Sequence, residues 1–288
     1  MNVRAAASWE DFRRLVHRAD ELGYDVFAAP DHLGALSPFA VLAAAAATSG
    51  RLRLRTYVLN VGFWNPALLA REVATLDLLS GGRAELGVGA GHTRSEHDDA
   101  GLRWRPLAER LALLEAVVLE VRRRLGDEGH QPRPVQQPVP LLVGAMSHQG
   151  LAVAARHADV VGFSGLRATK GGPPEEFTLA SAAETAERVR GVRRQAGGRP
   201  YRSDVLLQAV IIGREPEETA ARIVATAPHL TLEQIVDTPF VLLGRDADHG
   251  AEELRRRRER YGFDSVTTHQ PNMEALGEVM AAYRRGAG

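Results

Sequence analysis

Short apolar segments alternate with helical patterns along the whole chain, and this alternation constrains the fold more than any other feature. The clearest unit covers residues 65–101. It begins with leucine and valine residues at helical spacing. Ser80-Gly81-Gly82 ends this helix, and residues 84–89 (AELGVG) then form a strand that leads into a glycine-rich polar loop. A helix, a strand and a polar loop in this order are typical of a barrel or an open α/β sheet, where loops after the strands carry the chemistry.

The same alternation predicts further strands, and a short first strand is possible at Asn2–Ala5. The other predicted strands cover residues 25–29, 51–59, 141–143, 159–163, 204–212 and 265–268. About eight strands over 288 residues favour a closed (β/α)8 barrel over a doubly wound open sheet. We therefore expect an α/β fold, a TIM barrel with a short or truncated first strand, in which residues 1–288 form one domain.

Composition excludes several classes of protein. Hydrophobic residues make up 44% of the chain and charged residues 25%, which is ordinary for a globular protein. The formal net charge is zero, so neither a nucleic acid nor an anionic membrane is an expected partner. The absence of cysteine excludes disulfides, thiol catalysis and cysteine metal sites, and it is compatible with a cytoplasmic location. No apolar run is long enough to predict a membrane-spanning helix.

Two residues beside predicted strand ends are candidates for acid–base chemistry. His32 directly follows strand 25–29, and Glu96 lies in the polar run HTRSEHDD after strand 84–89. An imidazole titrates near neutral pH and can transfer a proton. The residues alone leave two alternatives open, because His32 could bond a backbone carbonyl and Glu96 could pair with Arg94. His92 and His97 are further candidates in the same loop.

Two glycine-containing loops could hold a ligand. The spacing GxGxG at residues 87–91 leaves little side-chain bulk, so a flat ring or a phosphate could approach the backbone, although a tight turn would give the same pattern. Residues 144–147 open a helix, whose amino end could bind phosphate, although Ser147 could simply cap that helix. We expect no metal site in residues 92–99, because neighbours on one loop rarely converge on an ion.

Four segments, in order and with similar spacing, resemble the bacterial luciferase-like superfamily. They are GYDVFAAPDHLG (23–34), YVLNVGFWNPALLARE (57–72), ATLDLLSGGRAELGVGAGHTRSEHDDAG (74–101) and PLLVGAMSHQGLAVAARHADVVGFSG (140–165). The likeness covers about residues 9–165 and is looser beyond. Within the superfamily, the chain is most similar to the deazaflavin (coenzyme F420)-dependent oxidoreductases of actinobacteria.

This resemblance implies an F420-dependent oxidoreductase with a luciferase-like barrel. Hydride would pass between C5 of the deazaflavin and a C=C, C=N or C=O carbon of a small molecule, which could be a natural product or a modified peptide. His32 and Glu96 are the implied catalytic residues. The implied cofactor contacts are Asp31, Leu59, Asn60, Val61, Gly89, Ala90, Gly91, His92, Gly144, Ala145, Met146 and Ser147.

The resemblance also implies a backbone feature and leaves alternatives. A non-prolyl cis peptide is expected at Leu59-Asn60 or Asn60-Val61, behind the cofactor ring. An FMN-dependent monooxygenase and a non-catalytic cofactor-binding barrel remain the rival functions. Homodimers are common among relatives, and the apolar helix at residues 38–48 could serve such an interface. Residues 166–174, expected to be a flexible loop, and residues 229–236 would shape a substrate pocket that the sequence does not identify.

Overall fold

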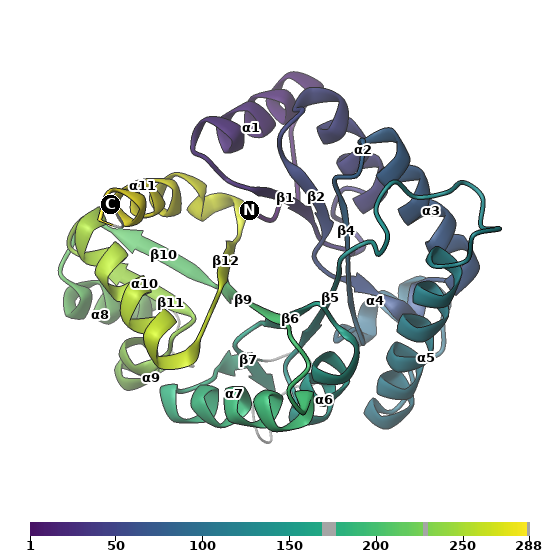
Figure 1. Ribbon diagram of the computed structural model, residues 1–288. Coiled ribbons are helices and arrows are strands. Elements are labelled where there is room, and N and C mark those ends of the chain that lie inside the picture. The colour runs from purple at the N-terminus through teal and green to yellow at the C-terminus, as the bar shows by residue number, and fades with distance from the viewer. Residues whose placement is uncertain (169–176, 227–229, 287–288) are drawn as a thin grey trace.

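A ring of parallel strands with helices on its outer side forms the centre of the computed structural model (Figure 1). The structure describes residues 1–168, 177–226 and 230–286. Its strands are β1 (Val26–Ala29), β2 (Arg53–Thr56), β3 (Leu59–Asn60), β4 (Ala84–Gly89), β5 (Leu141–Ala145), β6 (Val160–Phe163), β7 (Leu166–Ala168), β8 (Phe177–Leu179), β9 (Arg202–Leu207), β10 (Ala209–Ile212), β11 (Val241–Gly244) and β12 (Ser265–Thr268).

Helices follow most of these strands and cover the ring. They are α1 (Trp9–Glu21), α2 (Pro38–Thr48), α3 (Pro66–Leu79), α4 (Arg94–Asp99), α5 (Leu107–Leu125), α6 (His148–His157), α7 (Ala182–Ala196), α8 (Pro216–Thr226), α9 (Leu232–Asp237), α10 (Ala247–Tyr261) and α11 (Met273–Arg285), with short 3-10 turns at Val61–Phe63 and Gln270–Asn272. In the described parts of the chain, no helix combines the length and apolar character needed to cross a membrane.

The amino-terminal segment closes the ring. The main sheet has the order β1-β2-β4-β5-β6-β9-β12, and β3 also pairs with β4. Asn2 forms parallel bridges to Ala28 on β1 and to His269 after β12. The backbone N–H of Asn2 donates to the Thr268 carbonyl at 2.8 Å, and that of Val3 donates to the Ala28 carbonyl at 2.8 Å. The fold is therefore the expected (β/α)8 barrel, and its first strand is reduced to this short bridge.

Most predicted elements are present, with three informative differences. Residues 94–99, expected as a loop, form helix α4. Residues 166–168, expected as part of a flexible loop, form β7, which pairs antiparallel with β8. The remainder of that predicted loop, residues 169–174, lies outside the described residues, as does residue 229. The long predicted strand 204–212 is divided at Gln208 into β9 and β10, and β10 leaves the ring to pair with β11.

Side chains alternate between the two faces of each strand, and glycine lies on the inner face at the mouth. On β4, Leu86 and Val88 belong to a core between the barrel and its helices. Gly87 and Gly89 are the inward positions in between. A Cβ on Gly87 would lie 2.0 Å from the Thr56 carbonyl oxygen. The inward glycine at position 87 therefore lets the end of β2 approach β4 closely.

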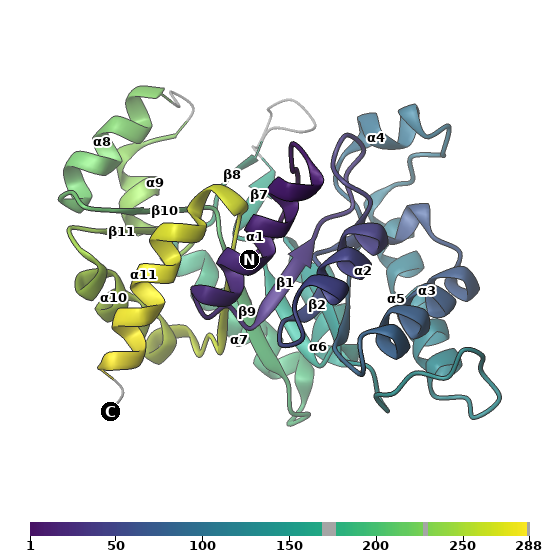
Figure 2. The ribbon, with the colours of Figure 1, turned by 90° about the horizontal axis from the view of Figure 1, so that it is seen from above.

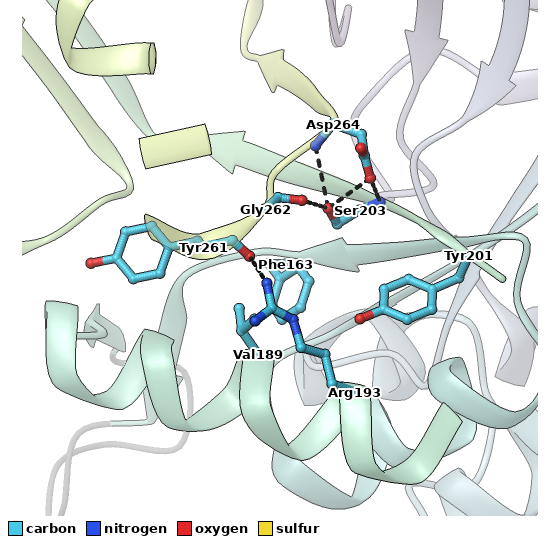
Figure 3. A pocket seen from close by; sticks show the side chains of 8 residues that line it. All are labelled: Phe163, Val189, Arg193, Tyr201, Ser203, Tyr261, Gly262 and Asp264. Atoms are coloured by element: carbon cyan, nitrogen blue, oxygen red, sulfur yellow. Dashed lines mark hydrogen bonds between the residues drawn. The ribbon is translucent and has the colours of Figure 1, made fainter. Parts of the chain in front are cut away.

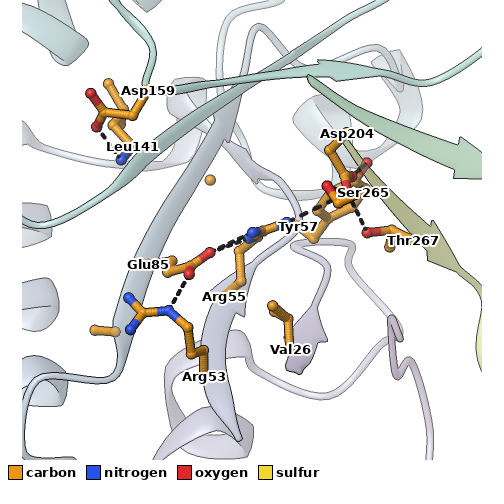
Figure 4. A network of polar contacts seen from close by, with 12 residues as sticks. Val26, Arg53, Arg55, Tyr57, Glu85, Leu141, Asp159, Asp204, Ser265 and Thr267 are labelled. Carbon is orange, nitrogen blue, oxygen red and sulfur yellow. Dashed lines mark hydrogen bonds and ion pairs between the residues drawn. The ribbon is translucent and has the colours of Figure 1, made fainter. Parts of the chain in front are cut away.

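A buried network of charged side chains lies inside the barrel towards the amino ends of the strands (Figure 4). Glu85 on β4 accepts hydrogen bonds from Arg53 and from Arg55 Nε, the latter at 2.6 Å. Asp204 on β9 accepts the Tyr57 hydroxyl at 2.7 Å and lies 3.8 Å from Arg55 Nη1. Although burial opposes ionisation, the two guanidinium groups hold the pKa of Glu85 below its usual value. We call these five residues the base network.

Candidate functional site at the barrel mouth

Polar side chains gather at the carboxyl ends of the strands, which is the mouth of the barrel. His32 follows β1, His92 follows β4, and His269 follows β12. Helix α4 and the β7–β8 hairpin lie at this same end (Figure 2). The catalytic sites of TIM barrels form at this end because loops from many strands meet there. The mouth is therefore the candidate functional site.

His32 and Glu96, predicted from separate segments, form a hydrogen-bonded pair at the mouth. His32 Nδ1 and Glu96 Oε1 are 2.7 Å apart. Since a carboxylate only accepts hydrogen bonds, Nδ1 carries the proton in this contact, and Nε2 is the nitrogen on the side of the ring away from Glu96. The side chains of His32 and Glu96 are 25% and 14% exposed. The pair is accessible enough to meet a ligand and sheltered enough to keep a fixed geometry.

Helix α4 carries Glu96 and packs against aromatic side chains through His97. His97 is buried, and its ring contacts Phe63 and Trp104 at centroid distances of 5.0 and 4.9 Å. Arg94 pairs with Asp98 at 3.4 Å, so it does not take Glu96 as its partner. The sequence pattern suggested a loop here because the segment is almost entirely polar. The buried imidazole of His97 and the hydrogen bond between Glu96 and His32 are tertiary contacts that hold this short helix.

Asp31 holds two neighbouring groups in place at the barrel mouth. Its Oδ2 accepts the Trp64 indole N–H at 2.8 Å and the Asn60 backbone N–H at 3.2 Å. Burial raises the pKa of Asp31 above its usual value, and this effect outweighs the opposing hydrogen bonds from Trp64 and Asn60. Asp31 thus joins the end of β1 to the end of β3 directly beside His32.

The predicted position of the cis peptide is wrong. The non-prolyl cis bond joins Tyr57 and Val58. Leu59 and Asn60 instead pair in regular parallel register with Val88 and Gly89, so the irregular backbone lies before them. The side chains of Leu59 and Val61 are fully buried in the core outside the barrel. They could therefore meet a ligand only through backbone atoms.

Side chains from other segments occupy more of the space above the two glycine loops than the sequence suggested. A Cβ on Gly89 would lie 2.9 Å from Val58 Cγ2, and one on Gly144 would lie 3.0 Å from Val58 Cγ1. Gly91 has a positive φ of 73°, and a Cβ there would lie 2.4 Å from Asn60 Oδ1. The space above these glycines is thus occupied by Val58 and Asn60. A flat ring at the mouth would rest on these side chains rather than on bare backbone.

The start of α6 combines a capped helix with accessible backbone. Ser147 Oγ accepts the Gly150 N–H at 3.1 Å, which confirms the capping alternative. Residues 144–147 are half-buried, as are Ala90 and Gly91. Ser164, directly after β6, has a buried hydroxyl that finds no hydrogen-bond partner within the described residues. A polar ligand at the mouth could supply that partner.

Sequence reasoning missed two polar residues at the mouth. His269 Nε2 lies 3.2 Å from Gln208 Oε1, and the Gln208 amide donates to the Ser164 carbonyl at 2.7 Å. Burial lowers the pKa of His269, and the positive charges of Arg4 and His32 act in the same direction. The signal that identified His32, a histidine directly after a strand, is also present at His269 and would have identified it.

A cavity lies at the end of the barrel opposite to the mouth (Figure 3). Its volume is about 160 Å³. It is bordered by Ser203 near the start of β9 and Asp264 before β12, so it opens at the amino ends of the strands. Arg193 donates to the Tyr261 carbonyl at 3.2 Å there. In the described ranges, no three histidine, aspartate or glutamate side chains converge as a metal site would require.

Comparison with known proteins decides the family. Residues 1–282 match the family described as luciferase-like monooxygenase. The chain belongs to the luciferase-like family. Solved structures agree in fold: an F420-dependent secondary alcohol dehydrogenase superposes with a TM-score of 0.76 at 16% identity, with 99% of each chain covered. The F420-dependent tetrahydromethanopterin reductase from Methanopyrus kandleri gives 0.75 at 18% identity, covering 98% of this chain and 99% of its own.

Two curated relatives are more similar in sequence. The F420-dependent glucose-6-phosphate dehydrogenase of Amycolatopsis mediterranei is 32% identical over 223 residues, which is 66% of this chain. The protein of the same name from Segniliparus rotundus is 31% identical over 223 residues, or 69% of this chain. In both cases the match spans 65% of the relative's own length.

Proposed function

We propose that this luciferase-like protein is an F420-dependent oxidoreductase acting on a small molecule. The observation that carries the proposal is the hydrogen bond between His32 and Glu96 at the barrel mouth. Two relatives above 30% identity bear names that specify F420. Superposable structures with F420-dependent activities support the same cofactor through their fold.

The residues at the mouth fit a deazaflavin. Val58 and Asn60 offer a surface for a flat ring, and the start of α6 offers amide groups for a phosphate. The unpartnered hydroxyl of Ser164 fits a polar group of the same ligand. Residues proposed to contact the cofactor are Asp31, Asn60, Gly89, Ala90, Gly91, His92, Gly144, Ala145, Met146 and Ser147.

His32 is proposed to move the proton that accompanies the redox step. A bound deazaflavin supplies or accepts a hydride at its C5. Glu96 holds the His32 ring with Nδ1 protonated, so Nε2 is the atom that can accept or deliver a proton at the mouth. Glu96 also stabilises positive charge on the ring once both nitrogens are protonated. Glu96 is therefore a positioning residue, and His32 is the residue that touches the reactants.

A cofactor titration tests the proposal against its main rival. The family description names a monooxygenase, and the alternative to test is a monooxygenase that uses FMN. Purified protein is titrated separately with F420 and FMN while the ring fluorescence of each is followed. We expect saturable binding of F420 and at least tenfold weaker binding of FMN. Tight FMN binding without affinity for F420 would reverse the assignment.

Turnover tests the remaining rival, a barrel that binds the cofactor without chemistry. Glucose 6-phosphate is a logical first substrate because the relatives are named for it. Oxidation or reduction of F420 is followed by absorbance with a panel of sugars, ketones and alcohols. A His32→Ala variant should bind F420 as before. If it also turns over a substrate as fast as the unchanged protein, the catalytic role of His32 is excluded.

A further inference from the structure

An apolar pocket of about 260 Å³ adjoins the mouth on the side of the β7–β8 hairpin. It lies among the hairpin, β10, β11, α8 and α9. No charged side chain lines it among the described residues. Its apolar lining is Leu166, Phe177, Leu179, Ala209, Ile211, Ile223, Leu230, Ile235 and Val241.

Two polar residues, Gln208 and Thr178, line the pocket. Only the side chain of Gln208 has hydrogen-bond partners among the described residues. Gln208 uses its amide N–H on the Ser164 carbonyl and its Oε1 on His269. Thr178 is 8% exposed, and its hydroxyl is buried without a hydrogen-bond partner among the residues that the structure describes. A buried hydroxyl without a partner costs free energy, so a ligand oxygen that bonds it would recover that cost.

Aromatic contacts connect this pocket to the candidate catalytic pair. Phe177 lines the pocket, and its ring meets His92 edge-to-face at 5.4 Å. The His92 ring meets His32 in the same way at 5.4 Å. The rings of Phe177 and His92 therefore lie between a molecule in the pocket and His32. On another side, Gln208 connects the pocket to His269.

We propose that this pocket binds the apolar part of the substrate, together with one oxygen that hydrogen-bonds Thr178. The proposal rests on the proposed function and specifies its substrate class. A phosphorylated sugar does not fit, because the described residues of the lining include no cation to pair with its charge, and its hydroxyl groups would face apolar side chains. The substrate class is instead a hydrophobic ketone, alcohol or related molecule with few polar groups.

Binding of a neutral fluorescent probe tests the pocket without requiring turnover. N-phenyl-1-naphthylamine becomes fluorescent in apolar sites and is titrated into the purified protein. Ile211→Gln places an amide in the pocket, so its affinity for the probe should fall at least tenfold. Val236→Gln is the matched control, because Val236 is 54% exposed on α9 and does not line the pocket. We expect the control to stay within twofold of the unchanged protein.

Competition against the probe tests the role of Thr178. Acetophenone and α-methylstyrene have nearly the same shape, but only acetophenone carries an oxygen acceptor. The unchanged protein should prefer acetophenone, and Thr178→Val should weaken acetophenone alone by about three- to tenfold. Thr178→Ser keeps the hydroxyl and should keep the preference. An unchanged preference in Thr178→Val would overturn the hydrogen bond.

The outcomes separate failure of this proposal from failure of the proposed function. F420 binding with no probe binding, or equal probe binding by Ile211→Gln, overturns the pocket alone. Probe binding without F420 binding overturns its assignment to a hydride-transfer substrate. Displacement of the probe by glucose 6-phosphate at the concentrations where acetophenone acts overturns the substrate class. Displacement by acetophenone but not by the sugar phosphate supports it.

Discussion

Two histidine–glutamate pairs with the same contact distance lie in different parts of this barrel. His32 and Glu96 are 2.7 Å apart at the mouth, and His157 and Glu115 are 2.7 Å apart where α6 ends. Exposure does not distinguish the histidines, at 25% for His32 and 21% for His157. The pairs differ in their surroundings. Glu115 also binds Arg156, and both of its partners come from one outer helix.

The comparison teaches that pair geometry alone does not identify a catalytic group. The mouth pair joins the end of β1 to α4, and the His32 ring also meets the ring of His92 at a centroid distance of 5.4 Å. The outer pair joins two neighbouring helices on the surface of the barrel, α5 and α6. Only the mouth pair lies where loops from several strands converge. The outer pair therefore provides a natural control for the predictions about His32 and Glu96.

The largest expected effect is loss of activity in His32→Ala. Removal of a general acid–base group lowers kcat by about 10²- to 10⁴-fold. Unfolding in urea should show a change within about 0.5 kcal/mol, because the side chain is partly exposed. His157→Ala is the matched control and should keep kcat within twofold. Equal losses in both variants would show that the mouth pair has no special role.

The second prediction concerns the base network, in which Arg55, Glu85 and Asp204 are buried. Arg55→Met removes the cation that Glu85 and Asp204 share in the base network. Breaking a buried ion pair typically costs about 3–5 kcal/mol, because the partners stay buried without a counter-charge. Urea unfolding measures this loss, and Arg71→Met, at an exposed pair with Glu72, should cost less than about 1 kcal/mol. A loss below 1 kcal/mol in Arg55→Met would contradict the structural role of the network.

The sequence predicted the fold well because its signals are local. Pro38 marks the start of one helix and Ser147 caps another, and the helices at 38–48 and 148–157 match the structure residue for residue. Long-range pairing is different. The base network joins Arg55, Glu85 and Asp204 from three strands. The charged residues at alternate positions of β2 were its only local sign.

The candidate site was predictable where a polar residue directly follows a strand. His32 was found in this way, and its contact with Glu96 was not, because it joins residues 64 positions apart. The glycines were correctly placed at the mouth. Val58 fills the space above Gly89 and Gly144. It comes from another segment, so the glycine pattern could not predict it. Contacts between side chains from different strands are therefore the feature of the site that could not be predicted from a single sequence.

A smaller effect is expected when the Glu96 charge is removed but its shape is kept. Glu96→Gln can still accept from His32 Nδ1, but it no longer stabilises a positive imidazole. Hydrogen bonds to charged groups contribute about 1.5–3 kcal/mol, so kcat should fall by about 10- to 100-fold while KM stays nearly constant. Glu96→Asp should recover part of the loss, and Glu115→Gln should have no effect on kcat. A rise in KM at constant kcat would assign Glu96 to substrate binding instead.

The smallest expected effect concerns His269, which burial keeps neutral at the mouth. Its pKa is lowered in the folded state, so below about pH 6.5 the unfolded chain binds more protons than the folded protein. The free energy of unfolding should therefore fall as the pH drops below 6.5, by at most about 1.4 kcal/mol per pH unit for one site. Urea unfolding at pH 7.5, 6.5 and 5.5 measures this slope. His269→Gln should reduce it, whereas His17→Gln, exposed on α1, should not. Parallel pH profiles for all three proteins would mean that protonation of groups other than His269 lowers the free energy of unfolding. The mouth would then be no more sensitive to protonation than the outer surface.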